Sequence, residues 1–294
     1  MEKQKRAYLY ACVAVLLWST IASAFKISLR YVDVLTLLFY ASVVASVFLF
    51  LYLLFLQKLK LLKAFTGRDY LRSAILGFLN PFLYYAILLK AYSILKAQEA
   101  VTLNFIWPIM LVLLSIPILH QKIKLKSILS IIISFIGVFV IATEGDVLGF
   151  RFTNTVGVLL ASGSSVVWAL FWIYNIKDKH DEAVRLFVNF SFGTVFIFLS
   201  ILLFSELKIP NRNGLLGAVY VGLCELGITF LVWLKALRLS KTTAHVTNLI
   251  YLVPFFALIV VSLVVGEKIL FSTVTGLVLI VCGIILQRFW AGPT

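Results

Sequence analysis

Charged side chains are scarce in this chain. Only 13% of its 294 residues are charged, whereas 62% are hydrophobic, and the mean hydropathy is +1.07. Soluble domains contain roughly 25% charged and 45–50% apolar residues. The composition therefore excludes a soluble domain and predicts an all-α integral membrane protein.

Cysteine and histidine are scarce as well, with three of each. The cysteines, Cys12, Cys224 and Cys282, lie singly in apolar segments, and none has the spacing of a zinc ligand. The 12 acidic residues are scattered, without the clustered Asp, His or metal ligands of a membrane-embedded enzyme. We therefore expect no enzyme, no metal and no cofactor.

The charge that is present is mostly positive, with a formal net charge of +14. A basic chain can bind nucleic acid, but these residues are spread over short loops, so we expect no nucleic acid. If the N-terminus lies inside the cell, 18 of the 26 Lys and Arg residues fall on the cytoplasmic side, which agrees with the positive-inside rule. We predict an inner-membrane protein of a bacterium with both termini in the cytoplasm.

Long apolar runs fill the rest of the chain. A transmembrane helix needs roughly 20 consecutive apolar residues. Polar or charged residues divide the sequence into ten such runs, at 7–28, 34–56, 70–90, 97–119, 125–143, 155–176, 184–205, 214–235, 242–265 and 270–289. The connections are short, so we predict ten transmembrane helices and no soluble domain.

Two stretches in different halves of the chain match each other. LKAYSILKAQEAVTLNFIWP at 89–108 aligns with LKALRLSKTTAHVTNLIYLVP at 234–254. The offset is 145 at the start and 146 after one inserted residue, where Pro108 falls on Pro254. The match predicts an internal repeat.

The repeat defines two domains of five spans each, 1–145 and 146–290. Because five is odd, the second unit must cross the membrane in the opposite direction to the first. Inverted repeats are typical of transporters, whose substrate site lies near the midplane between the halves. We set aside the terminal AGPT, 291–294, as a remnant of cloning.

One carboxylate interrupts an apolar run. GLCELGITF, at 222–230, places Glu225 where a charge costs on the order of 3 kcal/mol. At the offset of 145, Glu225 falls on Asn80, which precedes the helix-kinking Pro81. Two interpretations stay open: a structural acid bonded to a hydroxyl such as that of Thr229, or a group that binds a substrate amine, carries a proton, or does both.

Aromatic residues make up 15% of the chain. They gather with polar residues at Trp18, at Asn104 and Trp107, and at Trp168 and Trp172, which are four apart and share a helix face. Such residues can pack the core or line a cavity, and both interpretations stay open. A cavity with aromatic walls, an amide and a carboxylate would suit a zwitterion with an apolar or aromatic side chain.

These motifs carry a resemblance to a known family. They are LLWST (16–20), AQEAVTLNFIWP (97–108), HQKIK (120–124), SVVWALFWIYNIK (165–177) and VPFFALIVVSLVVGEKI (253–269). With them the whole chain resembles the drug/metabolite transporter superfamily, specifically the ten-span exporters of the EamA type. LLWST, NFIWP and the Trp of span 6 are most similar to bacterial aromatic amino acid exporters.

The resemblance implies a basket-shaped bundle of two inverted five-helix repeats. Spans 1–4 and 6–9 would surround a central cavity, and spans 5 and 10 would lie outside it. The implied function is secondary transport by alternating access: export of amino acids, including aromatic or apolar ones, or of similar small metabolites. Import or exchange of metabolites and drug export are the alternatives within the superfamily, and a channel is a further one.

The expected partners are a small-molecule substrate and membrane lipid, with the protein as a monomer. From the residues and the resemblance together, the predicted substrate-binding residues are Glu225, Asn80, Trp107, Trp168, Tyr84, Phe82, Asn104, Trp18 and Trp172. Glu225 is also the candidate proton carrier. Pro81, Pro108 and Pro254 are the predicted kinks or hinges.

Overall fold

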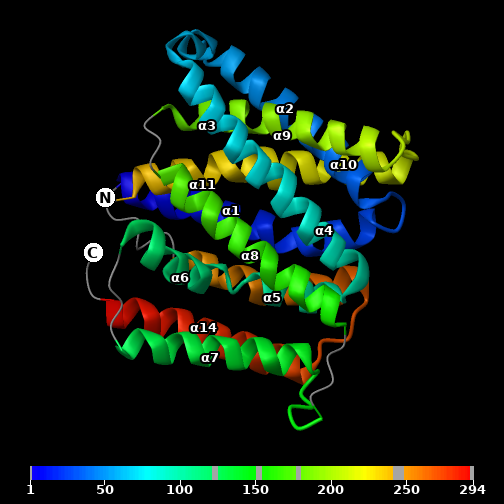
Figure 1. Ribbon diagram of the computed structural model, residues 1–294, viewed down its shortest axis with the longest axis vertical. Helices are drawn as coiled ribbons and strands as arrows, with labels where there is room; N and C mark the ends of the chain where they lie inside the picture. The colour runs from blue at the N-terminus through cyan, green and yellow to red at the C-terminus, as the bar shows by residue number, and fades with distance from the viewer. Residues whose placement is uncertain (1, 121–124, 150–153, 177–179, 241–247, 292–294) are drawn as a thin grey trace.

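The computed structural model describes residues 2–120, 125–149, 154–176, 180–240 and 248–291 (Figure 1). Within these residues the chain forms helices and loops, without a strand. The prediction of an all-α membrane protein is confirmed at that level. Of the set-aside terminal AGPT, residues 292–294 lie outside the described part.

In the described residues, seven helical segments are long and apolar enough to cross a membrane. They are Glu2–Ser28, Val34–Phe55, Gly67–Ile94, Ala97–Ile118, Thr155–Asn175, Glu182–Phe204 and Arg212–Leu239. Three further apolar helices are shorter: Ile128–Ala142, Leu249–Val265 and Phe271–Leu286.

The first half of the chain contains α1 (Glu2–Ser28), α2 (Val34–Phe55), η1 (Leu59–Ala64), α3 (Gly67–Gly77), η2 (Phe78–Leu83), α4 (Tyr84–Ile94), α5 (Ala97–Asn104), α6 (Trp107–Leu119) and α7 (Leu125–Ala142). The second half contains α8 (Thr155–Ile176), α9 (Glu182–Phe204), α10 (Arg212–Val221), η3 (Gly222–Gly227), α11 (Ile228–Leu239), η4 (Asn248–Leu252), α13 (Val253–Val260), η5 (Val261–Val265) and α14 (Phe271–Ala291).

The helices run back and forth between two ends of the bundle (Figure 1). We call the end with the starts of α1, α3 and α9 the N-end, and the end with the starts of α2, α5 and α10 the far end. Short polar residues fix several starts. Asp33 accepts the Thr36 backbone N–H at 2.9 Å before α2, and Asp181 accepts the Ala183 N–H at 3.1 Å before α9. These caps satisfy N–H groups that a helix start leaves unpaired.

Two of the long segments contain a π-helical turn near the middle. One is η2, between α3 and α4, where Asn80 has the non-helical angles φ −151° and ψ 119° and precedes Pro81. The other is η3, between α10 and α11, which ends at Gly227 with φ −95° and ψ −83°. Each π-helical turn interrupts the regular hydrogen bonding of its helix. It also changes the direction in which the side chains of the turn point.

The helices α7 and α14 pack along each other at one edge of the bundle, at the bottom of Figure 1. Glycines permit the close contact: a Cβ added to Gly137 would lie 2.5 Å from the carbonyl oxygen of Gly276. Helix α1 contacts α11, α13, α10 and η3. This arrangement brings the middle of α1 next to η3.

Candidate functional site

The carboxylate of Glu225 lies in η3 and is only 7% exposed. Its Oε1 accepts a hydrogen bond from the Tyr85 hydroxyl at 2.6 Å. Its Oε2 is buried and has no hydrogen-bond partner among the described residues. A further hydrogen-bond donor or a cation at this oxygen would stabilise the buried carboxylate.

The partner of Glu225 differs from the one considered from the sequence. The Thr229 hydroxyl donates to the Cys224 carbonyl within the same helix, so it does not serve the carboxylate. Tyr85 comes instead from α4, across the bundle. The Trp18 side chain, from α1, also lies close enough to interact with Glu225. The carboxylate therefore joins three helical segments that are far apart in sequence.

An aromatic cluster surrounds this carboxylate; we define it as Trp18, Tyr84, Tyr85, Trp168, Phe230 and Trp233. The ring centroids of Trp168 lie 4.7 Å from Tyr84 and 5.8 Å from Phe230. Trp18 lies 6.3 Å from Phe230, at an angle of 85°. These are the distances and tilts of favourable aromatic pairs. The structure thus brings the predicted Trp18, Tyr84 and Trp168 together with Glu225.

A series of hydrogen bonds borders the aromatic cluster on one side. The Tyr84 hydroxyl donates to Asn104 Oδ1 at 3.2 Å, and Asn104 Nδ2 donates to the Ser164 hydroxyl at 2.8 Å. Asn104 is the last residue of α5, just before the helix breaks and restarts as α6. The predicted Asn104 therefore joins α4, α5 and α8 beside the cluster.

Two of the predicted residues lie elsewhere. Phe82 packs against Phe78 at 5.3 Å and Phe196 at 6.4 Å, in a separate group of rings. Asn80 is fully buried, and neither atom of its side-chain amide has a hydrogen-bond partner among the described residues. The same holds for Asn189 on α9, the helix against which η2 packs.

The remaining predicted tryptophans lie at the margin of the cluster. Trp172 packs edge-on against Trp168 at 5.9 Å, and its indole N–H is buried without an acceptor in the described residues. Trp107, the first residue of α6, is partly buried against the hydrophobic core.

The predicted kink prolines lie where helices break or restart. Pro81 lies inside η2, next to the non-helical Asn80. Pro108 is the second residue of α6, and Pro254 is the second residue of α13. Proline suits the first turn of a helix, where its missing N–H has no partner to lose.

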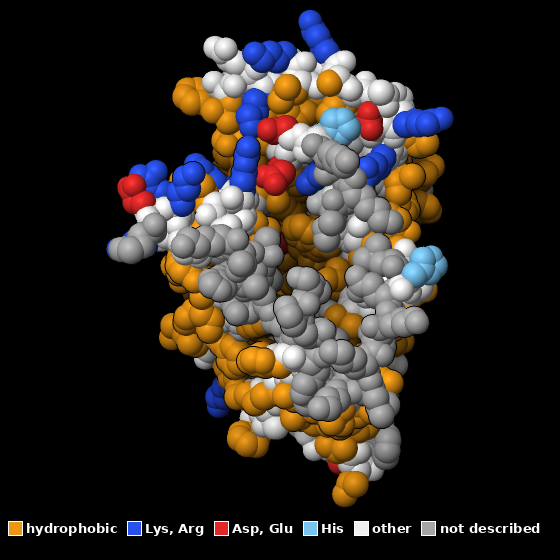
Figure 2. Space-filling view, turned by 90° about the vertical axis from the view of Figure 1, so that its left-hand side faces the viewer, with side chains coloured by type: hydrophobic (Ala, Val, Ile, Leu, Met, Phe, Trp, Pro, Cys, Tyr) orange, Lys and Arg blue, Asp and Glu red, His pale blue; other side chains and the backbone are white. Residues whose placement is uncertain are grey.

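A cavity of about 400 Å³ opens at the N-end of the bundle. Its lining residues are Lys3, Tyr52, Lys58, Asp181, Glu182, Ala183, Leu231, Leu234, Lys235, Arg238 and Leu239. Figure 2 shows this face as hollowed, with hydrophobic side chains at the floor and charged ones along part of the rim. Leu231 and Leu234 on the lining belong to α11, the helix that also carries Phe230 and Trp233 of the aromatic cluster.

One ion pair spans the mouth of this cavity. Lys58 Nζ lies 2.6 Å from Asp181 Oδ2. Burial by itself raises the pKa of Asp181, but the hydrogen bond and charge of Lys58 and two backbone N–H groups bring it below its ordinary value. The Asp181 carboxylate therefore stays charged at neutral pH.

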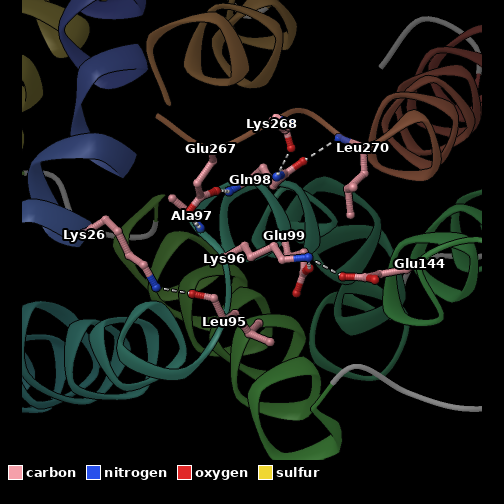
Figure 3. Close-up of polar contacts among 10 residues, drawn as sticks. All are labelled: Lys26, Leu95, Lys96, Ala97, Gln98, Glu99, Glu144, Glu267, Lys268 and Leu270. Atoms are coloured by element: carbon pink, nitrogen blue, oxygen red, sulfur yellow. Dashed lines mark hydrogen bonds and ion pairs between the residues drawn. The ribbon is translucent and has the colours of Figure 1, made fainter. Parts of the chain in front are cut away.

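A network of polar contacts joins helices and loops at the far end, as Figure 3 shows, beside a groove of about 550 Å³ between α1, α10 and η5. Glu267 accepts the backbone N–H groups of Ala97 at 2.9 Å and Gln98 at 3.2 Å. The Gln98 side chain donates to the Lys268 carbonyl and accepts the Leu270 N–H, both at 2.9 Å. These bonds tie the start of α5 to the loop between η5 and α14.

Lysines extend this network on both sides (Figure 3). Lys26, at the end of α1, donates to the carbonyls of Leu95 and Tyr92, the latter at 3.0 Å. Lys96 lies 2.5 Å from Glu144 and 3.7 Å from Glu99. The hydrogen bond to Glu144 raises the pKa of Lys96 above its ordinary value, although partial burial opposes the shift.

We call the contacts of Lys26, Lys96, Gln98 and Glu267 together the far-end seal. Glu99, in the first turn of α5, is only 2% exposed beside Lys96. The sequence did not single out Gln98 or Glu267, because Gln98 stands at the start of an apolar run and Glu267 lies in a short polar loop. It also missed Tyr85, although the offset of 145 that pairs Asn80 with Glu225 pairs Tyr85 with Phe230 of the cluster.

Comparison with known proteins places the chain among transporters. The model of the EamA-like transporter family matches residues 5–143 and again residues 155–289. An uncharacterized transporter of Clostridium kluyveri is 28% identical over 243 residues, which are 79% of this chain and 75% of the relative. An uncharacterized transporter of Archaeoglobus fulgidus is 24% identical and covers 96% of each chain.

A solved structure described as "Crystal structure of protein" has the same fold. Its TM-score is 0.66 at 19% identity, and the match covers 96% of both chains. At this identity the likeness concerns the fold alone.

Proposed function

Because the chain belongs to the EamA-like transporter family, we propose that it is a secondary transporter that exports amino acids, including aromatic or apolar ones, or similar small metabolites. One observation carries the proposal: a carboxylate with a buried oxygen that lacks a hydrogen-bond partner in the described residues lies beside an aromatic cluster, between a cavity at the N-end and a network of polar contacts at the far end. Glu225 binds the substrate's amine, and Trp18, Tyr84 and Trp168 contact its side chain.

In the proposed architecture the seven long and three shorter apolar helices all span the membrane. They form two inverted repeats, 1–145 and 146–290, in the bacterial inner membrane, with both termini in the cytoplasm and the protein as a monomer. The π-helical turns η2 and η3 support the repeat, since 78–83 and 222–227 nearly coincide at the offset of 145. The pairing of α7 with α14 away from Glu225 supports the placement of spans 5 and 10 outside the cavity.

The two ends of the bundle support alternating access. The N-end cavity is lined by α11, which also carries part of the aromatic cluster, whereas the far-end seal joins helices and loops at the other end. In the proposed cycle the substrate enters from the N-end, the seal then breaks, and the N-end closes behind the substrate. Helix breaks at Pro81, Pro108 and Pro254 are the proposed hinges.

The other predicted residues keep secondary roles in the proposal. Asn104 orients the Tyr84 hydroxyl, and Trp107 and Trp172 border the cavity. Asn80 and Phe82 contribute by shaping η2. If Glu225 exchanges a proton with the substrate during the cycle, it also couples transport to the proton gradient; the titratable groups near it are Tyr84, Tyr85, Tyr92 and Cys224.

Counterflow in proteoliposomes tests the proposed function. Vesicles preloaded with unlabelled aromatic, branched and small polar amino acids are challenged with labelled ones, for the wild type and Glu225→Gln. Glu206→Gln is the matched control, because Glu206 is an exposed acid in the loop after α9. We expect saturable exchange by the wild type and the control, and a loss of at least about tenfold in Glu225→Gln, since bonds to charged groups are worth roughly 1.5–3 kcal/mol.

The outcome that contradicts the proposal is specific. Equal exchange by Glu225→Gln and the wild type would remove the carboxylate from the site. No saturable exchange of any amino acid would refute an amino acid substrate. Exchange that runs in one vesicle orientation only, measured with a sided inhibitor, would decide between export and import.

A further inference from the structure

We propose that the site around Glu225 recognises an ammonium group on an apolar body and nothing more, so that its preferred substrates are organic monocations rather than zwitterions. This inference rests on the proposed transport function and names its substrate class. An amino acid presents two opposite charges, and the site offers a counter-charge for only one of them.

The first group that attracts a cation is the Glu225 carboxylate. Glu225 takes part in no ion pair among the described residues, and its buried Oε2 has no hydrogen-bond donor there. The side chains that interact with it are neutral: the Tyr85 hydroxyl donates to Oε1 at 2.6 Å, and the Trp18 indole lies close enough to interact. A buried charge without a paired cation is costly, so a ligand ammonium would gain both an ion pair and a strong hydrogen bond.

The aromatic cluster supplies the second attraction for a cation. Trp18 lies close enough to interact with Glu225. The ring of Tyr84 packs against Trp168 and against Tyr85, which bonds to the carboxylate. The face of an aromatic ring attracts a cation within about 6 Å, by roughly 0.5–2 kcal/mol, and tryptophan does so best. The same rings exclude water from an apolar ligand body. A carboxylate within aromatic rings is thus a site for an amine with a hydrocarbon portion.

Two lysines that could receive a ligand carboxylate already have other partners. Lys26 donates to the carbonyls of Tyr92 and Leu95. On α11, Lys235 lies over the ring of Tyr10, 4.7 Å from its centroid.

Of two neutral donors beside the cluster, one already has an acceptor and one has none among the described residues. Asn104 Nδ2 donates to Ser164, whose hydroxyl donates to the Ala161 carbonyl at 2.7 Å. The indole N–H of Trp172 is buried and lacks an acceptor in the described part of the chain. A single neutral N–H offsets only part of the desolvation of a carboxylate. A zwitterion would therefore bury one charge with little compensation.

Ligands that share one aromatic body test this inference on the unmodified protein. Phenethylamine is the monocation, phenylalanine the zwitterion, 3-phenylpropanoate the anion and 3-phenylpropan-1-ol the neutral control. Binding to the purified protein in lipid nanodiscs is measured by tryptophan fluorescence, and exchange is measured by counterflow. We expect phenethylamine to bind at least about tenfold more tightly than phenylalanine, a difference of about 1.4 kcal/mol, and the other two to bind more weakly than phenethylamine.

Two variants test whether the Glu225 carboxylate causes the preference for the monocation. Glu225→Gln should reduce phenethylamine affinity at least about tenfold and leave the affinity for 3-phenylpropan-1-ol within about twofold, because only the charged ligand uses the carboxylate. Glu206→Gln should change neither affinity. Should Glu225→Gln fail to fold, the ligand series on the unmodified protein still decides the question.

The two proposals fail in different ways. Tighter binding and faster exchange of phenylalanine than of phenethylamine would overturn the monocation inference and leave the transporter proposal standing. Exchange of neither amines nor amino acids would overturn both. Equal loss of the amine and the alcohol in Glu225→Gln would mean that the carboxylate acts through the structure of the site and would overturn the inference.

Discussion

The two ends of the bundle are closed by different chemistry. At the far end, Glu267 and Gln98 bond to backbone groups, whose positions are fixed by the helices and loops that carry them. At the N-end, one ion pair between Lys58 and Asp181 crosses the mouth of a cavity. Side chain to backbone bonds at buried positions are worth more than an ion pair near water. The contacts of the far-end seal should therefore hold their helices together more strongly than the ion pair at the N-end cavity does.

The sequence carries the same asymmetry. At the offset of 145, Gln98 falls on Thr243, and at 146, Glu267 falls on Gln121; both equivalents lie outside the described residues. Neither equivalent is a carboxylate, so closure of the N-end cannot reuse the carboxylate contacts of the far-end seal. Four predictions test this contrast with a reporter: Ala100→Cys, a fully buried position on α5 just inside the seal, in a variant with Cys12, Cys224 and Cys282 changed to Ala.

Removing the centre of the seal should have the largest effect. Glu267→Ala deprives the backbone N–H groups of Ala97 and Gln98 of their acceptor. We expect the reporter cysteine to react with a membrane-impermeant thiol reagent roughly 10- to 100-fold faster, since each bond to a charged group is worth about 1.5–3 kcal/mol. The exposed Glu206→Ala is the control. An unchanged rate would mean that Glu267 does not hold the far end shut.

Removing a peripheral contact should have a smaller effect. Lys26→Met keeps most of the aliphatic stem but loses the bonds to the Tyr92 and Leu95 carbonyls. The reporter should react about fivefold faster, because the lysine is half-buried and water replaces part of the lost interaction. Mass spectrometry of the labelled protein gives the rate. A rate equal to that of Glu267→Ala would show that the seal acts as one cooperative unit.

Alkaline pH should loosen the seal only above the normal range of lysine. The pKa of Lys96 is raised by its bond to Glu144, so the contact contributes fully below the ordinary value of 10.5 and is lost as the pH rises through the higher folded value. Reporter labelling, divided by that of a cysteine placed at exposed Glu206, should stay constant between about pH 7 and 9. A rise in labelling within that interval would contradict the role of the Lys96–Glu144 contact in the seal.

Breaking the N-end ion pair should have the smallest effect. Lys58→Met leaves Asp181 to cap α9 through the N–H groups of Ala183 and Val184. Reporter labelling at the far end should change by less than about threefold, because partly exposed ion pairs contribute roughly 0–1 kcal/mol. Transport assayed by counterflow should also persist. Far-end opening in Lys58→Met would mean that the two ends are strongly coupled.

Hydropathy alone was enough to predict where the helices lie. The apolar runs at 34–56 and 184–205 correspond to α2 at Val34–Phe55 and α9 at Glu182–Phe204. Lipid requires each spanning segment to be an apolar helix, whatever its neighbours are, so the sequence of each segment is sufficient to predict it. Helix interruptions could be anticipated only at prolines; η3 contains none, and its π-helical turn was not predicted.

The site was partly predictable for a related reason. Glu225 was identified because an acid inside an apolar run is rare, and Trp18 and Trp168 because they lie near polar residues. The partner of Glu225 could not be read from its own helix, since Tyr85 reaches it from α4. Phe82 was assigned to the site by the family resemblance, and in the structure its ring packs against Phe78 and Phe196. Contacts between helices depend on packing that periodicity does not specify.

Comparison of two reporters tests the central claim, that the site is reached from the N-end while the far end is shut. Ala100→Cys lies under the seal, and Leu234→Cys lines the N-end cavity. Both are labelled with the same impermeant thiol reagent in nanodiscs, which expose both ends. We predict that Leu234→Cys reacts at least about tenfold faster, equivalent to about 1.4 kcal/mol. Equal rates, or faster labelling at Ala100, would contradict the account.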